Sequence, residues 1–469
     1  MDSRTELSSH PSTAQLLARY DRPGPRYTSY PTAVSFDEGV GEEQYLECLA
    51  RADAEHHRPL SFYAHLPFCR ERCLYCGCNV VITPHHRIAR DYLANLLEEI
   101  ELLAAHLPRR RLLSQLHWGG GTPTYYSAFE LSRLMAAISE HFGFTRDAEI
   151  GIEVDPRATD PAHLETLGGL GFNRLSAGIQ DFAPDVQAAI HRIQTFEQTR
   201  DVLVRARAAG FRSINVDLIY GLPLQTAAGF QRTLEQVLEL RPDRIAVYSF
   251  AFVPWIKGHM RNLPADALPG PELKLELLAR ALDTFTGAGY RSIGMDHFAL
   301  PDDELALAAD NGTLGRNFMG YTVQSAGDLV GVGVSAIGDV QGTLFQNDKK
   351  LVTYERAAAE GRFPIERGYV RDADDLLRRD VIQGLMCNGR VEFAGIERAH
   401  GVRFRERFRP ELAELLAPGG AVADGLVTLA PGRLELTDVG RLFVRNVAMV
   451  FDRHLLAAGD GTNTFSRTV

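Results

Sequence analysis

The chain has 469 residues, of which 45% are hydrophobic and 23% charged, and this composition excludes a disordered or fibrous protein. A net charge of −10 argues against nucleic-acid binding by overall charge attraction. The sequence has no apolar stretch suited to a transmembrane helix and no visible secretory signal, so we expect a soluble, cytoplasmic protein without membrane insertion.

The N-terminal stretch is rich in Pro, Tyr and Arg through RYDRPGPRYTSYPTAVSF, which covers residues 19–36. It lacks helical periodicity, and the sequence therefore predicts an extended arm. We assign residues 1–58 to this arm.

Short apolar runs alternate with amphipathic segments from residue 60 to about 300. The segment 87–107 has apolar residues at helical spacing, and Asp160 followed by Pro161 is typical of a helix start. Six strand–helix pairs in series predict a parallel α/β core over residues 59–362, either a barrel or a doubly wound sheet. The predicted strands are Leu60–Leu66, Leu113–Trp118, Glu149–Val154, Arg174–Ile179, Ile214–Ile219 and Ile245–Phe250, followed by a short strand at Arg291–Gly294.

The pattern changes after about Phe363. Segments rich in Arg and Asp, such as Asp372 to Met386, predict helices, and a small β segment follows near GLVTLAPGRLELT. We therefore expect a separate, mainly helical C-terminal domain over residues 363–469.

Distinctive residues follow the ends of all six strands in the predicted core. In a parallel β/α fold these ends lie at one edge, where ligands bind. Each sequence could instead be only a turn, because Gly, Asp and Pro are common turn residues. Their coincidence at one edge favours a shared site. The sequences are a cysteine cluster, Gly119–Pro123, Glu153–Pro156, Gln180-Asp181, Asp217 with IYGLP, and Ala251.

Four of the six cysteines lie within ten residues: Cys69, Cys73, Cys76 and Cys78. The first three can supply thiolates to three irons of a [4Fe–4S] cluster and leave the fourth iron open to another ligand. The alternative is structural zinc, with Cys78 as the fourth thiolate. Because zinc sites usually pair two distant Cys-x2-Cys knuckles and no second knuckle is present, the spacing favours iron–sulfur.

The glycine-rich turn and two strand-end carboxylates carry weaker signals. The turn at Gly119–Pro123 either presents N–H groups to an anion or only permits a tight bend, and it lacks the lysine of a phosphate-binding P-loop. Glu153 and Asp217 either accept hydrogen bonds from ribose hydroxyls or an ammonium group, or are solvated turn carboxylates.

With Tyr75 before its last cysteine, the cysteine motif resembles that of the radical S-adenosylmethionine enzymes. The resemblance extends through PRYTSYPTA, CLYCGCN, LHWGGGTPTY, EVDPR, FNRLSAGIQDF, DLIYGLP, GMDHFALPDDELA and RNFMGYT, in this order from residue 25 to 322. In these blocks the chain is similar to the oxygen-independent coproporphyrinogen III oxidase (dehydrogenase) family of haem biosynthesis. The resemblance implies a partial (β/α)6 barrel with an N-terminal arm over its mouth and a mainly helical C-terminal domain.

The family resemblance also implies cofactors: a [4Fe–4S] cluster on Cys69, Cys73 and Cys76, and two molecules of S-adenosylmethionine. Cys78 is implied to be important for activity without binding iron. The chain departs from the family at Ile193 and Phe252, where Glu and His are usual. By motif match, the first S-adenosylmethionine meets Tyr63, Gly120, Glu153, Ala251 and Ile337. The second meets Tyr75, Gly121, Thr122, Gln180, Arg192 and Asp217.

The implied reaction is the oxidative decarboxylation of two propionates of coproporphyrinogen III to vinyl groups, giving protoporphyrinogen IX. A 5′-deoxyadenosyl radical removes hydrogen from the β-carbon of a propionate, and loss of CO2 and one electron follows. We expect Arg26 of the arm to contact a propionate, the alternative being a solvated basic tail. The electron donor and acceptor are not identified by the sequence, and a monomer is the family expectation.

Two other functions compete with this one. The related haem-chaperone branch shares the cysteine loop and the GGGTP block but binds haem. That branch lacks the CGCN extension and the RYTSYPTA arm, and this chain has both. A zinc-stabilised binding module is the third interpretation.

Overall fold

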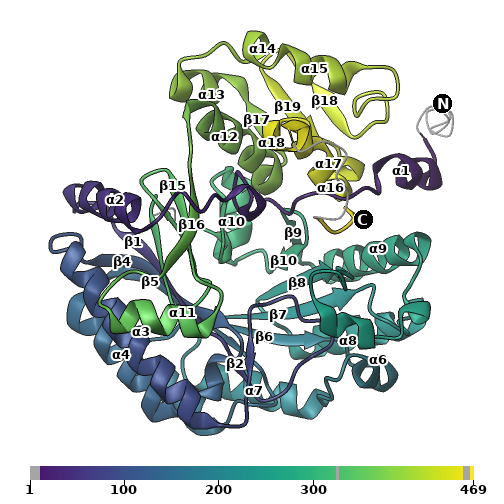
Figure 1. Cartoon of the computed structure of the whole chain (residues 1–469). Coiled ribbons are helices and arrows are strands. Elements are labelled where there is room, and N and C mark those ends of the chain that lie inside the picture. The colour runs from purple at the N-terminus through teal and green to yellow at the C-terminus, as the bar shows by residue number, and fades with distance from the viewer. Residues whose placement is uncertain (1–10, 324–326, 458–464, 469) are drawn as a thin grey trace.

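Six parallel strands form the centre of the molecule, a computed structural model that describes residues 11–323, 327–457 and 465–468 (Figure 1). They lie side by side in chain order, each pairing in parallel with the next. A doubly wound sheet would reverse its strand order at a switch point, so this order confirms the barrel. The strands are β1 (Leu60–Leu66), β4 (Leu112–Gly120), β5 (Gly143–Val154), β6 (Arg174–Gln180), β7 (Ser213–Tyr220) and β8 (Arg244–Ser249), and all six were predicted from the sequence.

The sheet does not close into a full barrel. Strand β13 (Leu329–Val332) pairs in parallel with β1, and three antiparallel strands extend that edge. At the other edge, β8 pairs with antiparallel β10 (His297–Ala299) and then β9 (Arg291–Ile293), which confirms the predicted short strand. The three strands beyond β13 are β14 (Ile337–Val340), β15 (Thr343–Asn347) and β16 (Ile365–Val370). A partial (β/α)6 barrel results.

The crossover helices lie on the outer side of the parallel strands (Figure 1). In α3 (His86–His106), buried residues recur at helical spacing, including Tyr92, Leu96 and Ile100. In α5 (Pro161–Gly169), Asp160 caps the first turn and Pro161 begins the helix, as predicted. The other crossover helices are α4 (Ala128–His141), α6 (Pro184–Ala189), α7 (Phe196–Ala208), α8 (Ala227–Leu240) and α9 (Pro271–Gly287).

The sequence predicted an extended N-terminal arm, but the arm is not extended throughout. Helix α1 (Thr13–Tyr20) contradicts that prediction, while residues 1–10 lie outside the described residues. Ser12 and Gln15 form a capping box, and Leu16 and Leu17 pack into the core of the C-terminal domain, so tertiary burial stabilises this short helix. Extended chain follows, and the arm ends with α2 (Glu42–Ala54).

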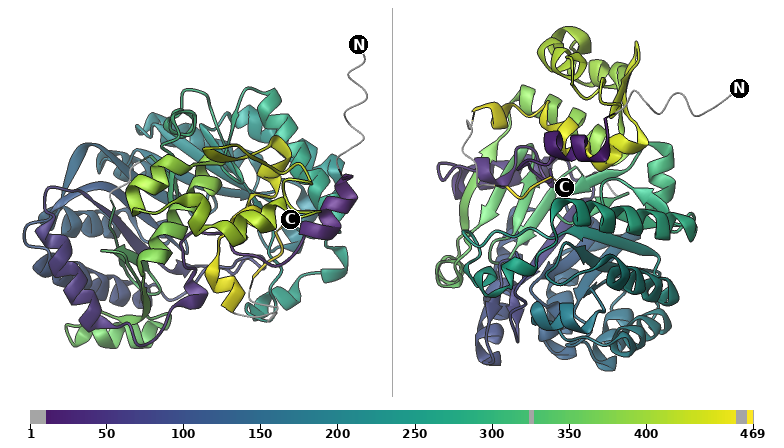
Figure 2. Two further views of the ribbon diagram at one scale, coloured as in Figure 1. Left: turned by 90° about the horizontal axis from the view of Figure 1, so that it is seen from above. Right: turned by 90° about the vertical axis from the view of Figure 1, so that its right-hand side faces the viewer.

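The C-terminal domain is mainly helical and has its own core, as expected. In both views of Figure 2, helix α1 lies against it. Strand β16 follows Phe363 yet belongs to the large sheet, so the chain enters this domain at α12 (Ala373–Asn388). The domain contains α13 (Phe393–His400), α14 (Phe404–Arg407), α15 (Arg409–Leu416), α16 (Asp438–Leu442), α17 (Val444–Met449) and α18 (Arg453–Ala457). A three-stranded sheet consists of β17 (Arg390–Glu392), β18 (Val427–Leu429) and β19 (Arg433–Leu436).

Short elements complete the fold: β2 (Phe68–Cys69), β3 (Val81–Ile82), α10 (Glu304–Asn311), β11 (Gly315–Asn317), β12 (Gly320–Thr322) and α11 (Leu351–Ala359). Among the described helices, none has the length and apolar character needed to cross a membrane.

Candidate functional site

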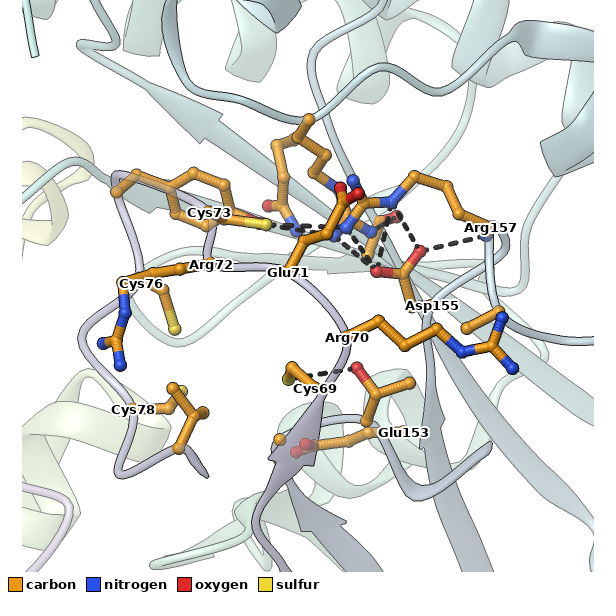
Figure 3. A pocket seen from close by; sticks show the side chains of 18 of the residues that line it. Cys69, Arg70, Glu71, Arg72, Cys73, Cys76, Cys78, Glu153, Asp155 and Arg157 are labelled. Carbon is orange, nitrogen blue, oxygen red and sulfur yellow. Dashed lines mark hydrogen bonds and ion pairs between the residues drawn. The ribbon is translucent and has the colours of Figure 1, made fainter. Parts of the chain in front are cut away.

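A cavity of about 1160 Å³ opens at the carboxyl ends of the parallel strands (Figure 3). The loops after β1, β4, β5 and β6 line it, together with residues of β7 and β8. The structure therefore gathers at one edge side chains that are far apart in the chain. Twelve predicted site residues line the cavity: Cys69, Cys73, Tyr75, Cys76, Cys78, Gly120, Gly121, Thr122, Glu153, Gln180, Arg192 and Asp217.

The cysteine loop is held in place by hydrogen bonds to its backbone. The Cys76 N–H donates to the Cys73 carbonyl at 3.2 Å, and the Leu74 N–H donates to the Ile190 carbonyl at 3.0 Å. Lys257 donates to the Cys78 carbonyl at 3.1 Å, and His259 contacts the Cys76 carbonyl at 2.9 Å. The loop is thus fastened to segments that follow β6 and β8.

Polar groups approach the cysteine sulfurs. The Cys69 Sγ lies 3.3 Å from the Thr122 hydroxyl. Arg157 and Arg192 point toward the Cys73 Sγ at 3.5 and 3.8 Å. A hydrogen bond from Cys78, helped by Lys257 and Arg72, lowers the pKa of Cys76 to about 6. The surroundings of Cys76 therefore favour the thiolate, the form in which cysteine binds metal, whereas burial raises the pKa of Cys69 to about 11.

The donor set fits an iron–sulfur cluster better than zinc. Within the described ranges, no three His, Cys, Asp or Glu side chains converge closely enough to hold one metal ion. Zinc needs four ligands around a single ion, whereas three thiolates of a cluster bind three different irons. The spread of Cys69, Cys73 and Cys76 around one cavity therefore suits the cluster (Figure 3).

Glu153 is the carboxylate held closest to the glycine turn. Its Oε2 accepts from the Gly120 N–H at 3.1 Å, and its Oε1 lies 3.4 Å from the His117 Nε2. Desolvation opposes ionisation, but the hydrogen bonds from His117 and Gly120 lower its pKa. Glu153 is thus an anionic acceptor in the cavity wall, suited to an ammonium group or hydroxyls.

A second carboxylate, Asp155, joins two arginines and was not predicted from the sequence as a site residue. Arg157 contacts both of its oxygens, and Arg192 Nη1 donates to its Oδ2 at 2.9 Å. Arg192 is 5% exposed, and its Nε has no hydrogen-bond partner among the described residues. A buried guanidinium with an unused N–H fits a site for an anionic or polar ligand group. The EVDPR block contained the signal for Asp155 and Arg157.

Packing within the protein requires glycine at two positions of the turn. Gly120 has φ +119°, and a Cβ there would lie 2.7 Å from the His65 ring. A Cβ on Gly121 would lie 2.5 Å from the Pro67 carbonyl. The sequence left open whether these glycines serve a ligand or only permit a bend, and packing within the protein is a sufficient reason for both.

Asp217 faces the cavity from β7. It accepts hydrogen bonds from Ser176 at 3.1 Å and Asn215 at 2.9 Å. Burial and the negative charge of Glu153 raise its pKa to about 6. Gln180, at φ +69°, ends β6 on the same side.

Four predicted residues lie outside the cavity wall. Tyr63 stacks on His117, the residue that contacts Glu153, with ring centroids 6.1 Å apart. Ala251 lies two residues after the end of β8, and Ile337 begins β14; both are half-buried. Arg26 lies 3.6 Å from Asp296, with its guanidinium 5.5 Å from the ring of Tyr248, which does line the cavity.

The two departures from the family pattern differ in their surroundings. Ile193 lines the cavity with 61% of its surface exposed. Phe252 packs in a small apolar cluster beside Tyr75, 6.3 Å from Phe250 between ring centroids.

Comparison with known proteins gives two family matches. Residues 63–237 match the Radical SAM superfamily, and residues 372–443 match the HemN C-terminal domain. The first match covers the cavity-bearing strands and the second covers most of the C-terminal domain.

Relatives match the chain over nearly its full length. The oxygen-independent coproporphyrinogen III oxidase of Pseudomonas aeruginosa is 46% identical over 447 residues, which cover 94% of this chain and 96% of that protein. The Escherichia coli protein of the same name is 46% identical over 440 residues, covering 94% and 95%. The solved structure of coproporphyrinogen III oxidase (HemN) from E. coli, described as a radical SAM enzyme, matches with a TM-score of 0.88 and 43% identity. It covers 95% of this chain and 100% of that chain.

Proposed function

This chain belongs to the oxygen-independent coproporphyrinogen III oxidase family, and from that premise we propose that its cavity oxidatively decarboxylates two propionates of coproporphyrinogen III to give protoporphyrinogen IX. The observation that carries this proposal is the three-cysteine loop at the carboxyl edge of a partial barrel, in a chain 46% identical to such oxidases. Haem binding, the alternative, is less well supported because the CGCN extension and the arm are both present.

Cys69, Cys73 and Cys76 are assigned to a [4Fe–4S] cluster. When bound, the cluster and S-adenosylmethionine supply the one-electron chemistry that starts with hydrogen removal from a propionate. The Thr122 hydroxyl and the guanidinium groups of Arg157 and Arg192 stabilise negative charge on the sulfurs of Cys69 and Cys73.

Two S-adenosylmethionine sites are assigned to the cavity. Its volume exceeds the ~300–1,000 Å³ of ordinary small-molecule pockets, which supports more than one occupant. The first site takes Glu153 and Gly120, with Tyr63 behind them and Ala251 and Ile337 in the surrounding packing. The second takes Arg192, Asp217 and Gln180 with Tyr75, Gly121 and Thr122.

Cys78 is assigned a role in turnover rather than in iron binding. It is exposed at the end of the loop, and its hydrogen bond to Cys76 connects it to the cluster ligands. A thiol there can move a proton or hydrogen atom at the cavity edge.

The arm is assigned to substrate recognition. Coproporphyrinogen III has four carboxylates, and a protein of net charge −10 repels it unless cations are concentrated at its site. Arg26 suits that task because its side chain lies over the ring of Tyr248 and remains 34% exposed. Asp296 holds it only loosely, at 3.6 Å, which leaves its N–H groups able to turn toward a propionate.

The test is an anaerobic assay of protein with reconstituted cluster. A reductant, S-adenosylmethionine and coproporphyrinogen III are added, and the expected product is protoporphyrinogen IX with two CO2 per substrate. Cys76→Ala serves as the inactive control. Tight haem binding without product formation would instead identify the haem-binding alternative.

A monomeric state, a cytoplasmic location and the lack of nucleic-acid binding remain predictions of the sequence. Sedimentation of the purified protein with its cluster measures the oligomeric state.

A further inference from the structure

Lysine is rare in this chain, and three of its four lysines lie near the cysteine loop. The chain has Lys257, Lys274, Lys349 and Lys350. Lys257 donates to the Cys78 carbonyl at 3.1 Å. Asn79, just after the cysteine loop, donates to the Lys349 carbonyl at 3.2 Å, which places Lys349 and Lys350 beside the loop as well.

Three of these lysines and Arg72 form one positively charged surface, which we call the basic patch: Arg72, Lys257, Lys349 and Lys350. The charges of Arg72 and Lys257 both act on Cys76 and on His259. Partial burial lowers the pKa of Lys349, and the positive charges of Arg367 and Lys257 lower it further. These cations therefore lie within electrostatic range of one another. Glu366 lies 3.8 Å from Lys349, and Glu71 and Asp348 adjoin the patch in sequence. These carboxylates offset the charge only in part, and the patch stands out on a protein of net charge −10.

Exposed apolar side chains adjoin the basic patch. Trp255 and Ile256 directly precede Lys257 and are 50% and 56% exposed. Trp and Arg are the residues most enriched at the energetic centres of protein interfaces, where charged residues usually form the rim. An apolar pair beside several cations is therefore typical of a protein-docking surface.

The position of the patch identifies the kind of partner. Gly77 and Cys78 of the cysteine loop are exposed beside it. Arg72 and Cys78 also line the cavity, so a donor docked on the patch lies at the cavity rim, close to the assigned iron ligands Cys73 and Cys76. The reaction needs an external one-electron donor, whose chemistry the sequence leaves open.

We propose that the basic patch with Trp255 and Ile256 docks an acidic protein that carries a one-electron redox centre and reduces the cluster. This inference rests on the proposed function. The partner loses one electron and the cluster gains it, and no atom is transferred. Opposite charges steer the partner to the patch, and the exposed tryptophan contributes apolar contact once docked.

The test compares two reductants on the protein with its cluster, under anaerobic conditions. One is an acidic flavodoxin kept reduced by its reductase, and the other is a photoreduced deazaflavin, a small molecule that needs no docking surface. The variant K349E/K350E changes two exposed side chains that are not part of the cavity lining. The matched control, R403E/R409E, makes the same charge change on exposed arginines of the C-terminal domain.

The rate of cluster reduction is measured by absorbance. With flavodoxin, K349E/K350E should be slower by about tenfold at low salt, a loss that shrinks as ionic strength rises because salt screens surface charges. R403E/R409E should match the wild type with both reductants. Trp255→Ala should also slow reduction by flavodoxin, with little change in the salt dependence.

Two outcomes would overturn the proposal. The first is a rate of cluster reduction by flavodoxin in K349E/K350E that lies within twofold of the wild-type rate. The second is a loss of reduction rate in this variant that is equal with both reductants. Failure of the proposed function is distinguishable, because wild-type protein reduced by deazaflavin would then make no protoporphyrinogen IX.

Discussion

Cys69, Cys73, Cys76 and Cys78 lie within ten residues of one another but differ in their surroundings. All four line the cavity, but polar groups approach the sulfurs of Cys69, Cys73 and Cys76, whereas Cys78 is the exposed member of the loop. The roles assigned to these cysteines can therefore be separated by single substitutions.

Replacing Cys69, Cys73 or Cys76 by Ala should abolish iron–sulfur absorbance, because two thiolates hold a cluster poorly. Cys78→Ser should keep the absorbance, since serine still donates a hydrogen bond to Cys76, and should lose turnover. Cys387→Ala, far from the loop in sequence and buried, is the control for general loss of a thiol. Loss of iron from Cys78→Ser as complete as from Cys76→Ala would contradict this division of roles.

Arg26 connects the arm to the barrel. We expect Arg26→Ala to raise the KM for coproporphyrinogen III by about tenfold, which corresponds to one charge-assisted hydrogen bond of ~1.5 kcal/mol. Iron content should stay unchanged, and Arg26→Lys should restore part of the affinity because it keeps the charge. Steady-state kinetics provide the measurement.

The exposed Arg22 of the same arm supplies the matched control, and Arg22→Ala should behave as wild type. An unchanged KM in Arg26→Ala would remove Arg26 from the substrate site.

At the scale of elements, Glu99 joins α3 to the segment between β13 and α11. It is 3% exposed and accepts hydrogen bonds from the Gly333 N–H, the Asn347 side chain and the Tyr354 hydroxyl, each at 2.7 Å. Burial raises its pKa to about 7, although these hydrogen bonds oppose the shift. The packing of α3 on this edge of the sheet therefore depends on pH.

The direction in which stability changes with pH follows from proton binding to Glu99. Between the ordinary pKa of 4.5 and about 7, folded protein holds a proton on Glu99 that the unfolded chain has lost. The stabilisation is complete below pH 4.5 and is lost as pH rises through 7. Relative to Glu99→Gln, the wild type should lose roughly 3 kcal/mol of unfolding free energy over this range.

Urea unfolding at several pH values measures this difference. The neighbouring exposed Glu98→Gln should keep the wild-type slope. Parallel pH profiles for wild type and Glu99→Gln would show that the titration lies elsewhere.

For the whole molecule, the arm lies between the barrel and the C-terminal domain (Figure 2). Leu16, Leu17, Tyr27 and Tyr30 belong to the core of that domain. Buried Arg445 donates to the carbonyls of Gly24 and Pro25 and to that of Arg467. Removing the arm would thus open a hydrophobic core, and point substitutions are the cleaner test of its function.

Arg445→Ala should loosen the arm while the barrel stays folded. Several backbone carbonyls lose their donor at a cost of ~1–3 kcal/mol each, so we expect a lower Tm and faster proteolytic cleavage near residues 20–30. The iron content should be retained. Arg441→Ala, an exposed arginine nearby, is the control, and equal cleavage of both variants would contradict the role given to Arg445.

The sequence by itself determined the six strands, the cysteine loop and most of the cavity wall. These features depend on local patterns: apolar runs of strand length, a capping pair at Asp160 and Pro161, and fixed cysteine spacing. Because the carboxyl ends of parallel strands meet at one edge, the strand pattern alone predicts that the residues after each strand lie close together.

Only the tertiary structure decided the remaining features. Helix α1 forms because Leu16 and Leu17 are buried against a domain that begins at α12, far along the chain, which no local pattern records. The sequence likewise could not show that backbone packing by itself requires a glycine at position 121, because the Pro67 carbonyl beside Gly121 comes from another loop. The link of Asp155 to Arg192, and the meeting of Lys257 and Lys349 at the cysteine loop, are also contacts between distant segments. Long-range packing fixes such contacts, whereas sequence periodicity reports only the near neighbours of a residue.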